Sequence, residues 1–323
     1  MPSYVYKSGS PTTVTSGTNV YVYTGSSTTA RANYIKVYNG SSWVTVYQYD
    51  TTPPSGGGIS SIVWNQAIPG FTVNYNSTSD ADSGLASYTL QYSSNGSSYS
   101  DVGAISTSGG AYSYAISSGG RGATHYFRTV AVDNVGLSTT SSALSKVAKP
   151  LGDFLFVPTS GDSWNGSQWM GFNANYALYE ATVRYSTTYP YGAYFFGSSI
   201  VDACKGYAAD SGTAYFQRAG ASQNNRGNTG TFSFRAHDLI SNGSQFTGAT
   251  FTGTTASVYI SGNDGFGSVS IPSDWLTAFA NASAYGIGLT GHDAPPGFLR
   301  GGTVSSNFNP FLIYSGTVGL TFN

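Results

Sequence analysis

The scarcity of charged side chains is the feature that most limits how this chain can fold. Asp, Glu, Lys and Arg make up 8% of its 323 residues, against about 25% in an ordinary soluble domain. Glu180 is the only glutamate. Soluble helices place such residues on their solvent face, so a largely helical fold is excluded. Abundant Tyr, Val, Thr and Phe between Gly, Ser and Asn instead indicates many short strands joined by tight turns.

Net charge and sequence patterns exclude several further classes of protein. Thirteen basic and 14 acidic residues leave a formal charge of -1, so nucleic acid is not an expected partner. No uncharged apolar run approaches the roughly 18 residues of a membrane span. The first residues lack the basic and apolar regions of a signal peptide, so we expect the mature protein to start at or near Met1. Cys204, the single cysteine, can form no internal disulfide.

Breaks in the pattern divide the chain into three segments. Residues 1–50 repeat a Val-Tyr strand end followed by a Gly/Ser turn, and alternation around Asn39-Gly40 predicts a β-hairpin. This hairpin segment is too small to be stable alone, so we expect it to attach to another protein or to copies of itself. Prolines and glycines at 53–58 begin a second segment, 51–149, and Pro150 opens a third, 150–323.

The middle segment has the spacing of seven short strands and resembles a fibronectin type III domain. The resemblance is carried by Trp64, by residues 87–92 with the Asn95-Gly96 turn, and by residues 126–136. It implies a β-sandwich in which Tyr126 occupies the tyrosine corner.

The third segment also alternates short strands with turns, and its length suits a jelly-roll-like β-sandwich with one short helix at 272–280. It resembles the C-terminal sandwich of minor tail proteins in siphophages that infect actinobacteria. Four stretches carry this resemblance: 194–206, 214–218, 232–237 and 270–289. The resemblance implies an all-β virion protein located in the tail, in contact with other tail proteins and assembled as a homo-oligomer, with a trimer favoured.

No residue pattern predicts catalysis, so we expect the chain not to be an enzyme. A glycosidase needs paired carboxylates, whereas Asp80, Asp82, Asp202 and Asp210 suit turns and caps. Two His-Asp dipeptides, beginning at His237 and His292, place neighbours on opposite faces of a strand. No serine lies in a Gly-x-Ser-x-Gly motif.

No metal site or cofactor is predicted either. Zinc binding needs clustered Cys and His, and this chain has one cysteine and three histidines, which lie in two segments. Residues 80–84, Asp-Ala-Asp-Ser-Gly, begin like a calcium loop, but Leu85 and Ala86 stand where further ligands are needed. We interpret this stretch as a loop between strands.

Glycan binding is the chemistry that this composition suits, because sugar faces pack on aromatic rings while amides bind the hydroxyls. The glycan-binding candidates come from two aromatic clusters: Trp164, Asn165, Gln168, Trp169, Tyr189 and Tyr191. The same rings could instead fill the core or a subunit interface. Three stretches predicted as long loops, 159–170, 219–230 and 291–306, are the expected recognition surface, with contact to a neighbouring tail subunit as the alternative.

The sequence therefore predicts a minor tail protein of a phage virion that contributes to the tail tip or fibre and to adhesion at the host surface. Two alternatives stay open. One is a secreted carbohydrate-binding protein, and the other is a capsid decoration protein.

Overall fold

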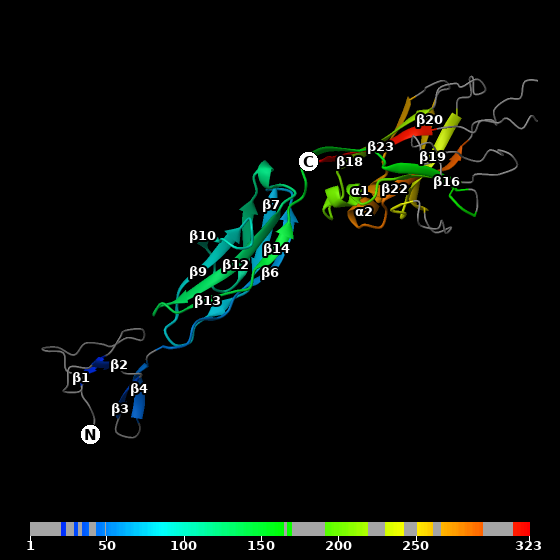
Figure 1. The fold of residues 1–323 in the computed structure, drawn as a ribbon. Coiled ribbons are helices and arrows are strands. Elements are labelled where there is room, and N and C mark those ends of the chain that lie inside the picture. Colours follow the sequence, from blue (N-terminus) through cyan, green and yellow to red (C-terminus); the bar gives the residue numbers. More distant parts are fainter. Residues whose placement is uncertain are drawn as a thin grey trace, which may run out of the picture. The chain divides into compact units, whose positions relative to one another are not determined.

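A computed structural model describes the chain as an all-β protein with short helices (Figure 1). The described residues are 21–23, 29–31, 34–38, 43–48, 50–164, 167–169, 191–218, 230–241, 251–260, 266–292 and 313–323. Two compact units are present, Met1–Ala148 and Lys149–Asn323. All strand pairs between the named strands of the described part are antiparallel, as expected when short turns join neighbouring strands.

The first unit begins with two small antiparallel pairs. Strand β1 (Tyr21–Tyr23) pairs with β2 (Thr29–Arg31), and β3 (Tyr34–Tyr38) pairs with β4 (Trp43–Gln48). The second pair flanks Asn39-Gly40, so the hairpin predicted from the alternation is confirmed.

The remainder of the first unit is a two-sheet sandwich. One sheet has the order β11-β7-β6, and the other has the order β10-β9-β12-β13, with β14 also paired to β12. The strand bounds are β6 Ile59–Asn65, β7 Gly70–Tyr75, β9 Leu85–Ser93, β10 Ser100–Ala104, β11 Gly110–Ala115, β12 Thr124–Asp133, β13 Ser138–Thr140 and β14 Leu144–Val147. A short pair, β5 (Ser55–Gly56) with β8 (Thr78–Ser79), and a 3-10 turn at Ser118–Gly120 complete it. This arrangement is a β-sandwich, as the sequence predicts.

Strict alternation along β12 builds the core of this sandwich. Every second residue from His125 to Asp133 is buried, and the Phe127 ring packs edge-on against Phe71 at 5.9 Å. The alternation also corrects the position of the corner residue, because Tyr126 points to the other face. His125 takes that place instead, with Nε2 bonded to the Gly120 carbonyl at 2.8 Å and Nδ1 to the Tyr92 hydroxyl at 2.9 Å.

The second unit is a jelly roll. Its strands are β15 Gly152–Phe156, β16 Ser160–Trp164, β17 Tyr191–Phe195, β18 Ser211–Arg218, β19 Gly230–His237, β20 Phe251–Ile260, β21 Phe266–Ser270, β22 Gly286–His292 and β23 Ile313–Phe322. They form sheets of order β15-β23-β18-β21 and β16-β17-β22-β19-β20. From β17 onward, successive strands cross between the two sheets, except that β19 pairs directly with β20 in one sheet. This is the strand order of a jelly roll, with β16 as an additional edge strand.

Two helices close one side of the jelly-roll core. Helix α2 (Ser273–Ala280) lies where Pro272 and the apolar spacing predict it, and it buries Trp275, Leu276 and Phe279. Helix α1 (Ser199–Cys204) buries Ile200 and Cys204 and has no counterpart among the predicted elements. It is too short to show helical periodicity, and Ser198 at its N-cap makes no side-chain capping bond.

The recognition loops predicted from the sequence need one correction. Residues 160–164 of the predicted loop 159–170 form strand β16 rather than a loop. The predicted loops 219–230 and 291–306 lie almost entirely outside the described residues, apart from Gly230 in β19 and residues 291–292 in β22.

Candidate glycan-binding site

The edge of the five-stranded sheet brings three of the six predicted glycan-binding residues together. Strands β16 and β17 pair so that Trp164 lies opposite Tyr191. The chain then turns back, and Trp169 forms an isolated antiparallel bridge with Trp164. Residues from two separate sequence clusters therefore become backbone neighbours, which no local pattern could have shown.

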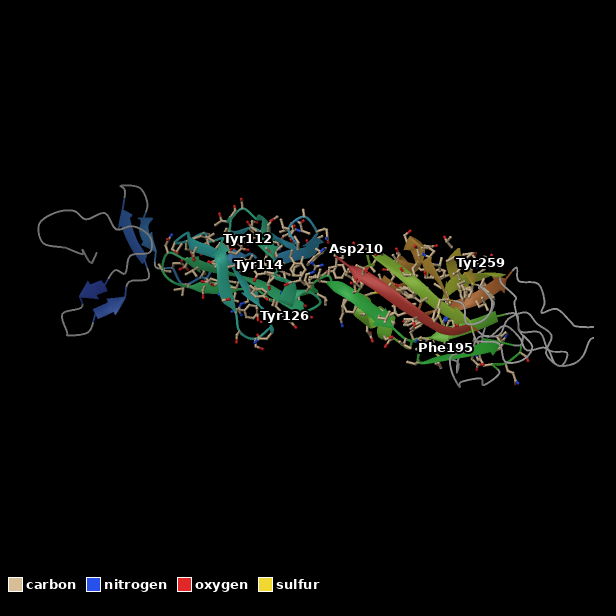
Figure 2. All side chains as sticks on the ribbon, turned by 90° about the horizontal axis from the view of Figure 1, so that it is seen from above. Tyr112, Tyr114, Tyr126, Phe195, Asp210 and Tyr259 are labelled. Carbon is tan, nitrogen blue, oxygen red and sulfur yellow. The ribbon has the colours of Figure 1, made fainter. Side chains whose placement is uncertain are left out.

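A row of aromatic rings extends from this edge across the outer face of the sheet. Trp164 and Trp169 meet edge to face with ring centres 5.3 Å apart, and Trp169 meets Phe195 in the same way at 5.3 Å. Phe195 continues the row, because its ring centre lies 5.6 Å from that of His237. Figure 2 labels Phe195. Perpendicular packing of this kind favours one ring orientation over others, so Trp169 is held in place from two sides.

The candidate residues differ in how much solvent they reach. Trp164 is buried, with 8% of its surface exposed, so its main role in this arrangement is to support Trp169. Trp169 is half-buried and Gln168 is exposed. Tyr191 is described by its backbone alone, and Asn165 and Tyr189 lie outside the described residues. The surface that the described residues offer to a ligand is therefore the Trp169 ring with the Gln168 amide beside it in sequence.

Two glycines of β22 make room for this row of rings. Gly286 lies opposite Phe195 on one side and opposite His237 on the other. A Cβ at Gly286 would stand 2.5 Å from His237 Cε1, and a Cβ at Gly288 would stand 2.5 Å from Phe251 Cε1. Real side chains do not tolerate such contacts, so the rings can cover the sheet only because β22 carries glycine there.

His237 is a structural residue rather than a base. Its Nε2 bonds the Tyr194 carbonyl at 2.9 Å, and its Nδ1 accepts the Leu239 N–H at 3.2 Å. Burial lowers the pKa of His237 from 6.5 to about 4, although bonds to backbone groups oppose the shift. The ring is therefore neutral at pH 7 with both nitrogens occupied.

Two of the aspartates considered for catalysis are engaged in polar contacts, and the single cysteine is buried. Asp210 forms an ion pair with Lys149, whose Nζ lies 2.8 Å from Oδ2. Asp202 accepts the Ser198 hydroxyl at 2.7 Å. Cys204 is buried, and burial raises the pKa of its thiol to about 11, so no thiolate is available as a nucleophile.

A second exposed surface of the jelly roll was not identified from the sequence. On the outer face of the four-stranded sheet, Leu155 and Tyr215 both lean over Gly319, within 3.9 Å and 3.5 Å of the position of its missing Cβ. Phe266 is 75% exposed, and it lies two residues before Ser268, the cross-strand partner of Tyr215. We call Leu155, Tyr215 and Phe266 the apolar face. These three residues alternate with buried residues along their strands, and this alternation can be seen in the sequence. It does not show which of the two faces points outward and which points into the core.

A group of aspartates in the first unit was also missed. Asp50, Asp80 and Asp133 each place one carboxylate oxygen within 4.8 Å of the others. From the sequence, a metal site was rejected for Asp80 and the loop that follows it, without the other two residues. Asp50 and Asp133 lie 30 and 53 residues away from Asp80 in the sequence, so no spacing rule connects them.

Comparison of the chain with protein-family models, with curated proteins and with solved structures finds no match. Among the described residues, no helix is long and apolar enough to cross a membrane. Support for a function therefore comes from the residues and the geometry of this chain.

Proposed function

We propose that this chain is a structural protein of a phage virion, a minor tail protein that contributes to the tail tip or fibre and adheres to glycans of the host surface through its jelly roll. The proposal joins the resemblance of residues 194–289 to siphophage tail proteins with the tandem arrangement of two β-sandwiches. In this proposal the fibronectin type III-like sandwich is a spacer, and the protein works in the virion tail among other tail proteins.

The observation that carries the adhesive role is the supported Trp169 ring. Two perpendicular ring contacts hold it at the sheet edge, and the exposed Gln168 amide precedes it. An aromatic face with an adjacent amide suits a sugar, because the ring packs on C–H groups while the amide bonds to hydroxyls. A rigid scaffold lowers the entropy that binding would otherwise cost.

The proposal includes no catalytic activity. Among the described residues, Asp50, Asp80 and Asp133 form a group in which one carboxylate oxygen of each lies within 4.8 Å of the others. Asp50 and Asp133 are almost completely buried, so a polysaccharide could not reach a general acid and base there. The neutral His237 and the protonated Cys204 supply neither a base nor a nucleophile at pH 7.

The apolar face suits contact with another protein subunit. Leu155, Tyr215 and Phe266 are exposed large apolar residues, and clustered residues of this kind mark interaction sites. We propose that this face is covered by a neighbouring tail subunit in a homo-oligomer, with a trimer as the favoured state.

Cell binding tests the adhesive role. Fluorescently labelled full-length chain should bind actinobacterial host cells. Trp169→Ala should weaken binding by about two- to tenfold, since ring contacts contribute roughly 0.5–1.5 kcal/mol beyond the area that they bury. Tyr259→Ala is the matched control, because Tyr259 is an aromatic residue 62% exposed on β20, at the opposite edge of the same sheet. It should bind like wild type.

Circular dichroism must show that both variants are folded. Equal binding of Trp169→Ala and wild type would contradict the proposed glycan surface. Antibody labelling of intact virions tests the tail assignment independently. Label at the tail supports it, label on the head indicates a capsid decoration protein, and label only in the culture medium indicates the secreted carbohydrate-binding protein.

A further inference from the structure

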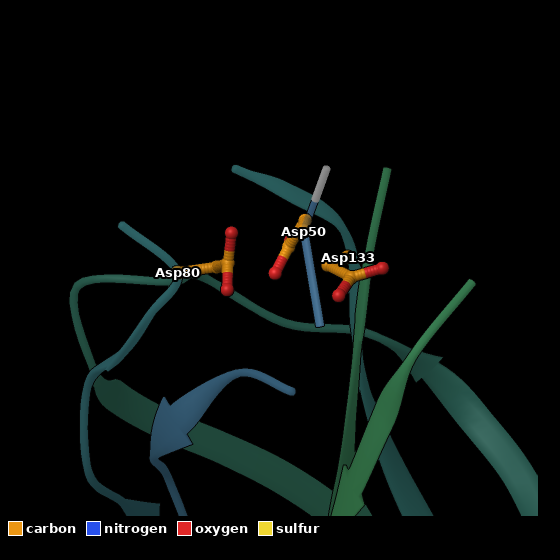
Figure 3. A group of neighbouring side chains, drawn as sticks. All are labelled: Asp50, Asp80 and Asp133. Carbon is orange, nitrogen blue, oxygen red and sulfur yellow. The ribbon is translucent and has the colours of Figure 1, made fainter. Parts of the chain in front are cut away.

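Three chain segments meet at one end of the fibronectin type III-like sandwich. Asp50 precedes β5, Asp80 begins the loop between β8 and β9, and Asp133 is the last residue of β12. One carboxylate oxygen of each residue lies within 4.8 Å of those of the other two. Figure 3 shows the three carboxylates drawn together, with Asp50 seen between Asp80 and Asp133.

Hydrogen bonds hold each carboxylate in a fixed orientation. Oδ1 of Asp50 accepts the Thr52 N–H at 2.9 Å, and its Oδ2 accepts the Ser83 hydroxyl. Oδ1 of Asp80 accepts the N–H groups of Ser83 and Gly84 at 2.8 and 2.7 Å. The cluster is therefore built by specific contacts and is not a chance meeting of mobile surface side chains.

Asp133 has a buried carboxylate oxygen without a hydrogen-bond partner among the described residues. Its side chain is only 1% exposed, and its Oδ1 accepts the N–H groups of Val135 and Leu137 at 2.9 and 2.8 Å. Its other oxygen, Oδ2, is buried and has no hydrogen-bond partner among the described residues. Buried carboxylate oxygens are rarely left in this state, because losing water without gaining a partner is costly.

The charge of the cluster is also uncompensated by the described part of the protein. No described Lys, Arg or His forms an ion pair with any of the three aspartates, whereas Lys149 pairs with Asp210 in the other unit. The three carboxylates therefore lie together without an ion-pair partner among the described residues.

We propose that Asp50, Asp80 and Asp133 bind a calcium ion. Hard divalent cations prefer carboxylate oxygens, whereas zinc and copper prefer nitrogen and sulfur. Ligands on opposite sides of a calcium ion, at about 2.3–2.6 Å each, lie roughly 4.6–5.2 Å apart. The spacing within the cluster is compatible with calcium. Magnesium demands near-ideal octahedral geometry and keeps several of its waters, so a site of fixed side chains favours calcium. A cation bound beside Asp133 is the kind of partner that its Oδ2 lacks.

The ion would connect the entering chain to the sandwich. Asn134 already donates its N–H to the Gly84 carbonyl at 3.0 Å, which joins the chain after Asp133 to the loop that begins at Asp80. Asp50 lies directly after the N-terminal hairpin region. A calcium ion would therefore tie the chain at Asp50 to both Asp80 and Asp133. We infer that chelation loosens the attachment of residues 50–54 and lowers the stability of the first unit.

Calorimetric titration of the full-length chain tests the proposal, using calcium chloride after treatment with EDTA. We expect one calcium per chain with a dissociation constant of about 10⁻⁴ to 10⁻³ M, as in extracellular calcium modules, together with weaker binding of magnesium. The melting temperature of the first unit should rise with calcium and fall again with EDTA.

Two variants test the ligands, and one serves as control. Asp133→Asn and Asp80→Asn keep an oxygen for their N–H donors but remove a charge, so each should weaken calcium binding by roughly tenfold or more. Asp101→Asn makes the same change at an exposed carboxylate that is bonded to Gln91 on the neighbouring strand, and it should bind calcium like wild type.

Three results would overturn the proposal. One is the absence of both a binding heat and a calcium-dependent melting shift, and another is unchanged affinity in Asp80→Asn and in folded Asp133→Asn. Equal affinities for magnesium and calcium would refute the choice of ion. If Asp133→Asn does not fold, Asp80→Asn decides the result, because Asp80 is only half-buried.

Discussion

Replacing Gly286 by alanine tests whether the ring row on the outer sheet face depends on missing side chains. Gly286 lies between Phe195 and His237, whose rings meet across it at 5.6 Å. A Cβ there would contact the Tyr194 carbonyl oxygen and approach His237 Cε1 to 2.5 Å. The first neighbour is backbone and the second is a buried ring with two hydrogen bonds, so neither can move freely.

The expected cost follows from these contacts. Ordinary van der Waals contacts of a Cβ begin at about 3.4 Å, so the neighbours must move by nearly 1 Å. Overpacking of this kind costs about 1–3 kcal/mol. For a unit of this size, each kcal/mol lowers the melting temperature by about 2–4 °C, which predicts a decrease of about 2–12 °C.

Gly291→Ala provides the matched control on the same strand. A Cβ at Gly291 would have Ser233 Cβ at 3.8 Å, an ordinary contact, as its nearest neighbour. Neither glycine has the left-handed backbone that disfavours alanine. Gly291→Ala should therefore raise stability by about 0.4–1 kcal/mol, because alanine restricts the unfolded chain.

Differential scanning calorimetry of the full-length variants measures both effects through the transition of the second unit. We expect a gap of about 1.4–4 kcal/mol between the two variants. Equal melting temperatures for Gly286→Ala and Gly291→Ala would refute this explanation, because the two substitutions differ in steric surroundings and not in chemistry.

Two further predictions concern titratable groups. The pKa of His237 is about 4 in the folded protein, below its ordinary value of 6.5, so the unfolded chain binds the extra proton and stability falls as pH decreases through this window. Urea unfolding should show that the free energy of unfolding falls by about 2 kcal/mol between pH 8 and pH 5. His237→Phe should flatten this pH dependence. An equally steep profile in the variant would show that other groups cause the pH dependence. Cys204 is buried with a pKa of about 11, so a thiol reagent at pH 8 should modify it at the rate of unfolding, and rapid stoichiometric labelling of the folded chain would contradict this placement.

Local patterns in the sequence were sufficient for several elements of the described part. Alternation along residues 124–132 predicts β12, and the proline and apolar spacing after 271 predict α2. Both elements are long enough to show their period, and their termini carry recognisable residues. Strand β16 was interpreted as loop because its Gly, Asp and Ser residues have turn propensity, which pairing with β17 overrides.

Side-chain roles within these elements were harder to predict than the elements themselves. Trp164 and Trp169 were found together because they are five residues apart, but their ring contact makes one residue the support of the other. Tyr126 and His125 differ by one position, and only the register of β12 against β9 determines which of them faces inward. A shift of one residue exchanges the two faces of a strand.

The all-β fold and the division into alternating strands and turns follow from composition and period, because both are properties of neighbouring residues. The aspartate cluster and the ring row depend instead on which strands lie side by side. Asp50, Asp80 and Asp133 come from three segments, and Phe195, Gly286 and His237 come from three strands. Residues so distant along the chain meet only when the apolar strand faces are buried and the sheets assemble. The free energy gained by this burial depends on the whole core rather than on any local stretch.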